Sequence, residues 1–247
     1  MIKKERVDIL LVERGLAESR TRAQALILAG LVVAGDQRVD KPGVRVAVET
    51  DLRLKGEVLP YVSRGGLKLK GALDHFKLDV KGAVCADIGA STGGFTDCLL
   101  QEGAVRVHAI DVGRAQLHEK LRQDPRVISR ERVNARNLTD EDLPESVDVM
   151  VIDVSFISLK LVLPAVLPKI KPKGLLIALV KPLFEVGFDR IEKGGVVRDL
   201  AARAEVIEDI RRFVAKAGFL EVGWIDSPLP GPAGNVEALL VARKPKK

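Results

Sequence analysis

Residues 84–96 read Val-Cys-Ala-Asp-Ile-Gly-Ala-Ser-Thr-Gly-Gly-Phe-Thr, a short apolar strand followed at once by a glycine-rich turn. Glycines at such a point let the backbone approach a ligand closely and turn sharply into a helix. The turn lacks the G-x-G-x-x-G spacing of dinucleotide enzymes and the Gly-Lys-Ser/Thr of a phosphate-binding loop, which argues against hydride transfer and nucleotide hydrolysis. A strand-to-helix turn without a ligand is the alternative interpretation.

Further apolar strands follow this one, and helical segments separate most of them. The connector between the last two strands, residues 226–235, carries three prolines and leaves no room for a helix, so these strands are expected to pair as antiparallel neighbours. The alternation predicts an α/β fold with a seven-stranded, mainly parallel sheet covered on both faces. The predicted strands are residues 84–88, 105–110, 127–129, 147–152, 175–180, 220–225 and 236–241.

The first sixty residues are typical of a separate, small α/β module. Apolar residues recur at helical spacing after Arg6, and Ser19 is placed to cap a second helix that ends at Gly30. Residues 31–39 contain two apolar runs joined by Gly-Asp, which predicts a hairpin, and a short strand is expected at residues 52–54. We therefore expect two domains, residues 1–59 and residues 60–247.

Charge is distributed unevenly along the 247 residues, which carry a formal net charge of +6. The first 62 residues hold eleven basic and nine acidic side chains, and residues 63–242 are balanced. The remaining positive charge lies on Arg243, Lys244, Lys246 and Lys247. Because the large domain is neutral and the two ends are basic, net charge suggests a polyanionic partner without establishing one.

Several protein classes are disfavoured by composition. The longest strongly apolar stretches, residues 25–33 and 175–180, are shorter than the roughly 18 to 20 residues of a membrane span. Acidic residues interrupt residues 1–14, so we expect no secretory signal and a cytoplasmic location. Two cysteines without a C-x-x-C pair and three scattered histidines predict neither a disulfide framework nor a metal site. We interpret Cys85 and Cys98 as small core residues.

Charged residues follow several of the predicted strands, where open α/β sheets bind ligands. Asp111 closes the second strand and can accept both hydroxyls of a ribose, and Asp153 and Lys181 follow the fourth and fifth strands. A lysine at the end of an apolar strand can have its pKa lowered and act as a base, whereas a solvated ion pair is the alternative. Glu237 on the last strand and Lys68 on the helix before the first strand fit the same edge of the sheet.

Longer stretches of the sequence resemble known families. Residues 6–16, with Ser19, Arg20 and the hairpin, resemble the S4 RNA-binding domain, and the rest of the chain resembles the FtsJ-like methyltransferases. Over essentially the whole chain, the combination resembles the TlyA family of ribosomal RNA 2′-O-methyltransferases, often labelled hemolysin A. The strongest matching stretches are residues 62–69, 87–96 and 153–159, Lys181-Pro182 and Phe184-Glu185. Residues 91–94 depart from the Ala-Pro-Gly-Gly of the wider FtsJ group, which favours the TlyA branch.

This resemblance implies a Rossmann-like class I methyltransferase domain, a small amino-terminal α+β S4 domain and S-adenosylmethionine as the cofactor. It implies a catalytic tetrad of Lys68, Asp153, Lys181 and Glu237. Cofactor contacts are expected from Asp87, Gly89, Ala90, Ser91, Thr92, Gly93, Gly94, Phe95, Asp111 and Asp153. RNA contacts are expected from Arg6, Ser19, Arg20, Arg22 and Arg64, since arginine forks match phosphate oxygens.

The implied reaction is methylation of a cytidine 2′-hydroxyl in 16S ribosomal RNA, with 23S ribosomal RNA as a second target in some members. Ribosomal RNA and ribosomal subunits are the expected partners. A ribose hydroxyl is a poor nucleophile, so we expect Lys181 to activate it, Asp153 and Lys68 to orient it, and Glu237 to hold the lysines. Two alternatives are a non-catalytic RNA-binding or ribosome-assembly protein and a membrane-active hemolysin, which the lack of an apolar span disfavours.

A second candidate RNA-binding feature is an arginine-rich stretch at residues 114–136. Its basic residues are Arg114, Lys120, Arg122, Arg126, Arg130, Arg132 and Arg136, and its acidic ones Glu119, Asp124 and Glu131. The stretch is interpreted either as an RNA-binding surface or as a solvated face. Because aromatic residues make up only 4% of the chain, we expect recognition of folded RNA by shape and backbone more than by stacking on many bases.

Overall fold

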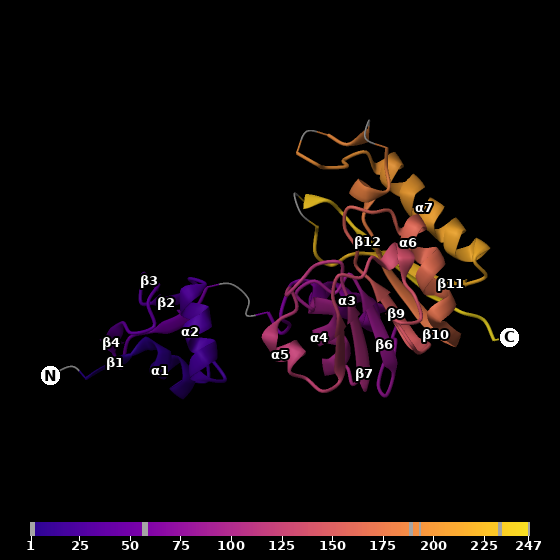
Figure 1. The fold of residues 1–247 in the computed structure, drawn as a ribbon. Coiled ribbons are helices and arrows are strands. Elements are labelled where there is room, and N and C mark those ends of the chain that lie inside the picture. Colours follow the sequence, from indigo (N-terminus) through magenta and orange to yellow (C-terminus); the bar gives the residue numbers. More distant parts are fainter. Residues whose placement is uncertain (1–2, 56–58, 188–189, 193, 232–233, 247) are drawn as a thin grey trace. The chain divides into compact units, whose positions relative to one another are not determined.

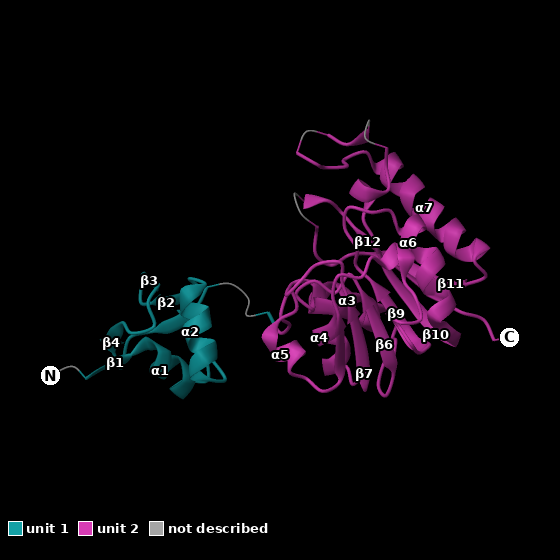
Figure 2. Cartoon of the chain, viewed as in Figure 1, with its two compact units in different colours: residues 1–59 teal, residues 60–247 magenta. Residues whose placement is uncertain are grey.

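The computed structural model describes residues 3–55, 59–187, 190–192, 194–231 and 234–246. The chain divides into two compact units, Met1–Leu59 and Pro60–Lys247 (Figure 2). Each unit has a hydrophobic core of its own: one cluster of buried side chains in the first, and two clusters, on opposite faces of a sheet, in the second.

The first unit combines two short helices with two small sheets (Figure 1). Ser19 caps the second helix by accepting a hydrogen bond from the Arg22 backbone N–H at 3.2 Å, and Gly30 follows that helix with a φ of +69°, so both predicted helix signals are confirmed. The hairpin and the strand after it are also where the sequence predicts them. The elements are β1 (Lys4–Arg6), α1 (Val7–Glu13), α2 (Arg20–Leu28), β2 (Val32–Ala34), β3 (Gln37–Val39), β4 (Arg45–Ala47) and β5 (Leu52–Leu54).

The sequence does not predict β1 and β4, which pair with each other in antiparallel fashion. Each strand has only three residues and none of these is fully buried, so neither carries an alternating apolar pattern.

The second unit contains a seven-stranded sheet with the order β11-β12-β10-β9-β6-β7-β8 in the described residues. β10, β9, β6, β7 and β8 are parallel, and β12 is antiparallel to both of its neighbours, as the sequence predicts for the last two strands. The strands are β6 (Val84–Ile88), β7 (Arg106–Ile110), β8 (Val127–Arg130), β9 (Val147–Ile152), β10 (Ile170–Val180), β11 (Leu220–Asp226) and β12 (Ala238–Arg243).

Two strands differ from their predicted extents by more than one residue at an end. β10 begins at Ile170 rather than at residue 175, because the polar Lys-Pro-Lys-Gly segment continues the strand through a shift of register between Ile170 and Leu175. β12 begins at Ala238, so Glu237 lies just before the strand and not inside it.

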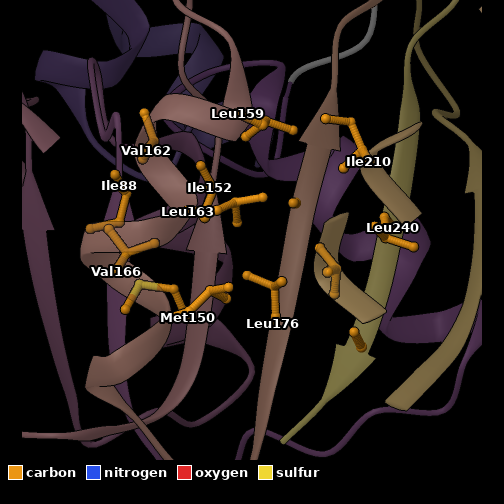
Figure 3. Close-up of a cluster of buried hydrophobic side chains, with 14 of the residues drawn as sticks. Ile88, Met150, Ile152, Leu159, Val162, Leu163, Val166, Leu176, Ile210 and Leu240 are labelled. Atoms are coloured by element: carbon orange, nitrogen blue, oxygen red, sulfur yellow. The ribbon is translucent and has the colours of Figure 1, made fainter. Parts of the chain in front are cut away.

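Helices cover both faces of this sheet, and the buried side chains beneath them form its two cores. α6 and α7 pack on one face, and Figure 3 shows Leu159 and Leu163 of α6 among the side chains of β9 and β10. α3 and α4 pack on the other face, where Cys85 and Cys98 are buried as predicted. The helices are α3 (Gly65–His75), α4 (Gly94–Gln101), α5 (Glu119–Arg122), α6 (Leu159–Val166) and α7 (Leu200–Lys216), with short 3-10 helices η1 (Ala135–Asn137), η2 (Leu167–Lys169) and η3 (Pro182–Phe184). In the described part of the chain, no helix has the length and apolar character needed to cross a membrane.

Candidate active site

A cavity of about 320 Å³ lies at the carboxyl ends of the central parallel strands. The turn after β6, the ends of β9 and β10, helix α3 and the loop before β12 all contribute to its wall. Sequence-predicted residues that line it are Arg64, Lys68, Asp87, Gly89, Ala90, Ser91, Gly94, Phe95, Asp153 and Lys181. The structure therefore brings to one place residues that the sequence spreads over more than a hundred positions.

Lys68 and Glu237 form a buried ion pair beside this cavity. Lys68 Nζ lies 2.5 Å from Glu237 Oε2, and the Glu237 side chain is only 2% exposed. Gly231, which also lines the cavity, packs so closely that a Cβ there would collide with Glu237 Oε1. A buried carboxylate with these neighbours has no room to move, so it holds the Lys68 ammonium at the wall of the cavity.

Lys181 and Asp153 form the second lysine–carboxylate pair. Lys181 Nζ lies 2.6 Å from Asp153 Oδ1 and donates a hydrogen bond of 2.8 Å to Ser155 Oγ. Asp153 follows β9 and Lys181 follows β10, and these two strands are parallel neighbours, which places both side chains at the same edge. Ser155 is a cavity residue that the sequence did not single out, although it lies two positions after Asp153.

The glycine-rich turn lies close to the end of β9. A Cβ at Gly89 would meet the carbonyl oxygen of Asp153 at 2.5 Å, and Gly89 has a φ of +84°, so a side chain is excluded there. Thr92 and Gly93 do not line the cavity. Gly93 instead packs against Leu117 and Leu121, so its role is to let α4 start close to the α5 region.

Asp87 is the last residue but one of β6, just before the turn, and it is completely buried. Its Oδ2 accepts hydrogen bonds from the backbone N–H and the hydroxyl of Thr96, at 2.9 and 2.7 Å. Its Oδ1 has no hydrogen-bond partner among the described residues. Burial raises the pKa of the Asp87 carboxyl to about 7 against the opposing effect of the Thr96 hydrogen bonds. An unpartnered carboxylate oxygen in a cavity wall is a point at which a polar ligand group can bind.

A second cavity, of about 490 Å³, adjoins the first and shares Gly89, Ser91, Asp153 and Ser155 with it. Asp111 lines this cavity, and its two carboxylate oxygens accept hydrogen bonds from the backbone N–H groups of Ser91 and Gly113, at 2.7 and 2.6 Å. Lining residues that sequence reasoning missed are Val112, Gln116, Val133, Asn134, Ala135 and Phe156. Five of them lie after β7 or β8 without a recognisable motif, and that position was their signal. Phe156 follows β9 and lies inside the matching stretch 153–159.

Phe156 is an aromatic side chain that the fold leaves in solvent. It is 91% exposed, has a φ of +63°, and lies against Phe184 with 5.2 Å between ring centroids. Lys181 Nζ lies 6.0 Å from the centroid of the Phe184 ring. A left-handed backbone at a large non-glycine residue is rare and is found preferentially at functional sites.

In the first unit, Asp8 organises two of the predicted RNA-binding arginines. Asp8 is fully buried and accepts two hydrogen bonds from Arg6, both 2.9 Å, one from Arg20 Nε at 3.0 Å and one from Gln24 at 3.0 Å. The Arg6 guanidinium is the main cause that holds the pKa of the Asp8 carboxyl far below its usual range. Within the described residues, Arg20 uses only Nε in this contact, which leaves its terminal nitrogens available to a ligand. The hydroxyl of Ser19 is committed to the cap of α2.

The arginine-rich stretch of the second unit separates into two sets. Lys120, Arg122 and Arg126 form ion pairs with Asp97, Glu119 and Asp124, at 3.6, 3.5 and 2.7 Å. The other set, Arg114, Arg130, Arg132 and Arg136, has no carboxylate within ion-pairing distance in the described part of the chain. Arg130 ends β8 and lies at the carboxyl edge of the sheet, and Arg136 follows Asn134 and Ala135 of the second cavity.

Comparison with known proteins places this geometry in a family. The FtsJ-like methyltransferase family matches residues 61–244, and the S4 domain matches residues 5–52. The 16S/23S rRNA (cytidine-2′-O)-methyltransferase TlyA of Mycobacterium tuberculosis is 47% identical over 98% of this chain and 91% of its own. YqxC, a candidate rRNA methyltransferase of Bacillus subtilis, is 48% identical over 96% of this chain and 85% of its own.

A solved structure supports the same relationship. A candidate hemolysin from Streptococcus thermophilus is 46% identical and superimposes with a TM-score of 0.75, covering 99% of this chain and 90% of that one. The sequence matches and this superposition both span nearly the whole chain, S4 domain included. The chain therefore belongs to the FtsJ-like methyltransferases that carry an amino-terminal S4 domain, the family that includes the TlyA proteins.

Proposed function

We propose that this chain transfers a methyl group from S-adenosylmethionine to the 2′-hydroxyl of a cytidine in 16S ribosomal RNA, with 23S ribosomal RNA as the second substrate. The observation that carries the proposal is the meeting of two lysine–carboxylate pairs, Lys68 with Glu237 and Lys181 with Asp153, at the cavity beside the glycine-rich turn. The 47% identical TlyA relative, named for this reaction, supports the choice of substrate.

The residues of the two adjoining cavities fit S-adenosylmethionine. The unpartnered Oδ1 of Asp87 offers an acceptor for a cationic group, and the absence of a side chain at Gly89 lets a ligand approach the backbone. Asp111 keeps lone pairs free for ribose hydroxyls, and the second cavity has an apolar wall that includes Val133 and Ile157. When bound there, the cofactor supplies a methyl group on a positively charged sulfur that a ribose oxygen can attack.

Lys181 is the residue that we assign to the hydroxyl. Its Nζ lies in the wall of the first cavity and, in its amine form, takes the proton that leaves the 2′-oxygen as that oxygen gains its methyl group. Asp153 and Ser155 hold the Lys181 side chain at 2.6 and 2.8 Å, which fixes the nitrogen in one position. Positioned proton transfer of this kind contributes about 10²- to 10⁴-fold to a rate.

Lys68, which lines the same cavity, is assigned to orient the same hydroxyl. Glu237 holds Lys68 and not Lys181, so its positioning effect reaches the reacting oxygen through one lysine. This refines the sequence-based hypothesis, in which Glu237 held the lysines as a group.

RNA binding is assigned to arginines that have nitrogens free for phosphate. In the first unit these are Arg20 and Arg22, with Arg6 held more tightly by Asp8. In the second unit they are the exposed Arg64 beside the first cavity and the set Arg114, Arg130, Arg132 and Arg136. The ion-paired Arg122 and Arg126 are assigned to the solvated face.

The arginine assignment has a matched control within one stretch of sequence. Replacing Arg130 and Arg132 by glutamine removes two charges that have no carboxylate partner among the described residues, whereas replacing Arg122 and Arg126 removes two ion-paired charges. We expect the first variant to lower RNA affinity and to reduce the dependence on salt by about one unit of slope per lost phosphate contact, and the second to change neither by much. Equal effects of the two variants would contradict the assignment.

The reaction itself is tested with the purified full chain. Calorimetry measures S-adenosylmethionine binding, and transfer of a labelled methyl group to 16S and 23S ribosomal RNA is followed by mapping of the methylated ribose. The wild-type chain is expected to bind the cofactor and to methylate a cytidine 2′-hydroxyl. Lys181→Ala is expected to keep cofactor binding and to lose most of the transfer, while Lys160→Ala, which removes an ion-paired lysine on α6, keeps both.

Two results would overturn the proposal. Near-native transfer by Lys181→Ala would remove the assigned role of that lysine. RNA binding by the wild-type chain without any transfer to either RNA would support the non-catalytic RNA-binding alternative.

A further inference from the structure

A second charged surface lies at the far end of the sheet from the candidate active site. β10 runs from Ile170 to Val180, and Lys181 of the active site follows its last residue. At about 3.3 Å per residue, ten steps along this strand correspond to about 30 Å. Residues around the start of β10 and the end of β12 are therefore too far away to take part in the chemistry.

A cavity of about 460 Å³ opens at this far end. Lys171, Lys244 and Lys246 line it, and its apolar wall includes Phe219, Pro168 and Pro172. No carboxylate is among its lining residues, all of which belong to the described part of the chain. Lys171 forms an ion pair of 2.9 Å with Asp148, which does not line the cavity. Lys244 and Lys246 have no carboxylate partner among the described residues.

Further cations without carboxylate partners surround this cavity. Lys173 lies two residues after Lys171, and Lys216 ends α7 directly before lining residues Ala217 and Gly218. In the residues that the structure describes, neither Lys173, Lys216, Arg243 nor Lys246 has a carboxylate within ion-pairing distance. Among the described residues of this unit, these cations form a second group without carboxylate partners, in addition to Arg114, Arg130, Arg132 and Arg136.

Lys244, which follows β12, is tied to the start of β10 by several hydrogen bonds. The Lys244 ammonium donates hydrogen bonds to the carbonyl oxygens of Ile170, Pro168 and Leu167, at 2.6, 3.3 and 3.5 Å. The Lys244 backbone N–H bonds to Gly174, and its carbonyl accepts from Lys173, both at 2.9 Å. Because these contacts fix the backbone, the basic side chains beside it project from a preorganised surface.

We propose that this distal basic surface, defined as Lys173, Lys216, Arg243 and Lys246, binds backbone phosphates of the RNA substrate about 30 Å from the reacting ribose. The inference rests on the proposed function, because that function supplies a polyanion large enough to reach both places. Unpaired lysines and an arginine on a fixed scaffold are the groups that contact phosphates, and such contacts position an RNA without reading its sequence.

This arrangement has a consequence for substrate size. An RNA fragment that occupies only the active-site end cannot contact the distal basic surface, so this surface does not increase the affinity for such a fragment. A folded ribosomal RNA or a whole subunit spans the distance and gains the additional phosphate contacts. The surface therefore favours large folded RNA over short fragments that carry the same target nucleotide.

The test compares two charge-matched triple variants of the full chain. The first, Lys173→Gln with Lys216→Gln and Lys246→Gln, removes three unpaired charges. The control, Lys70→Gln with Lys160→Gln and Arg212→Gln, removes three charges that ion pairs engage elsewhere on the same unit. Binding is measured without methyl transfer, by filter retention over a range of salt, with whole ribosomal RNA and with a stem-loop of about 20 nucleotides that contains the target.

We expect the first variant to bind whole ribosomal RNA about tenfold more weakly near 0.15 M salt and to lose two to three units of salt slope, at about one unit per phosphate contact. Its affinity for the short stem-loop and the behaviour of the control should stay unchanged. An equal loss of affinity for both RNAs would contradict the proposal, because it would indicate non-specific electrostatic binding. No loss of affinity for either RNA would show that the surface does not bind RNA. A loss only in the presence of ribosomal proteins would indicate an acidic protein partner instead. A wild-type chain that binds RNA but transfers no methyl group would defeat the proposed function and leave this comparison valid.

Discussion

Lys68 and Glu237 are 169 residues apart in the sequence and 2.5 Å apart in the structure. The pair joins α3, which precedes the first strand of the sheet, to the loop that enters its last strand. Both side chains are largely removed from water, so each ion depends on the other for compensation. A contact between residues from the beginning and the end of the second unit's sequence thus forms part of the candidate active site.

The first prediction concerns Glu237→Gln. Loss of the charge leaves the Lys68 ammonium buried without a counter-ion, which we expect to cost about 3 to 5 kcal/mol of unfolding free energy. Methyl transfer should fall about 100-fold because Lys68 loses its position, with S-adenosylmethionine affinity little changed. Chemical denaturation and single-turnover transfer measure the two effects.

A double variant separates stability from positioning in this pair. Lys68→Met with Glu237→Leu replaces both ions by apolar side chains, so the unfolding free energy should recover most of its loss. Methyl transfer should stay low. Recovery of both quantities together would show that the pair has only a structural role.

The second prediction concerns the pH dependence of stability through Asp87. Its folded-state pKa of about 7 lies above the ordinary value near 3.9, so the folded state binds a proton more tightly than the unfolded state does. The contribution to stability is complete below pH 4 and is lost as pH rises toward 7. The free energy of unfolding of Asp87→Asn should therefore decrease less between pH 5 and pH 8 than that of the wild-type chain.

Thermal unfolding of the cofactor-free chain across this pH range measures the difference. A residue without this burial provides the comparison: Asp140→Asn changes an exposed carboxyl that accepts a hydrogen bond from Lys169. Parallel pH profiles for Asp87→Asn and the wild-type chain would show that the Asp87 carboxyl is ionised throughout.

The third prediction concerns Asp8→Asn in the first unit. The pKa of the Asp8 carboxyl is lowered, so its stabilising contribution is present above pH 4 and is lost as pH falls below that value. The variant should expose α1 and α2 to faster hydrogen exchange at pH 7, and the difference from the wild-type chain should shrink in acid. RNA affinity should also fall, because Arg6 and Arg20 lose the group that holds them.

Exchange measured peptide by peptide locates the effect, since only peptides of residues 3–55 should respond. Arg6→Lys is the matched variant: it keeps a charge beside Asp8 but cannot donate the bidentate pair. If Asp8→Asn left exchange in α1 and α2 unchanged, Asp8 would not be the centre of that unit's polar network.

The fourth prediction concerns Phe156→Ala. The exposed aromatic ring of Phe156, which lines the second cavity, offers a face on which an RNA base can stack, worth about 1 to 3 kcal/mol per base. The variant should raise the KM for RNA or lower the rate of transfer, and Phe156→Trp should restore it. Cofactor binding should not change.

Val105→Ala is the control for this prediction, because Val105 is also exposed but lies before β7, at the other end of the strand. Equal effects of the two alanine variants on transfer would argue against stacking at Phe156.

Much of the local structure could be predicted because its signals lie within a few residues of each other. The cap at Ser19, the turn at Gly35-Asp36 and the apolar strand that runs into Gly89 each depend on neighbours in the sequence. The alternation of strands and helices likewise predicts a parallel sheet, and a parallel sheet brings Asp153 and Lys181 to one edge.

Other features were decided only by tertiary structure, because they depend on which distant segments meet. The sequence places Lys68 and Glu237 at the same edge of the sheet, but only the packing of α3 and the loop before β12 joins them as a buried pair. Composition alone also cannot divide the arginine-rich stretch, since Arg126 is neutralised by Asp124 while Arg130 has no carboxylate partner in the described residues. The local periodicity of the sequence encodes helices and strands, whereas the burial and pairing of charged side chains depend on which of those elements pack against each other.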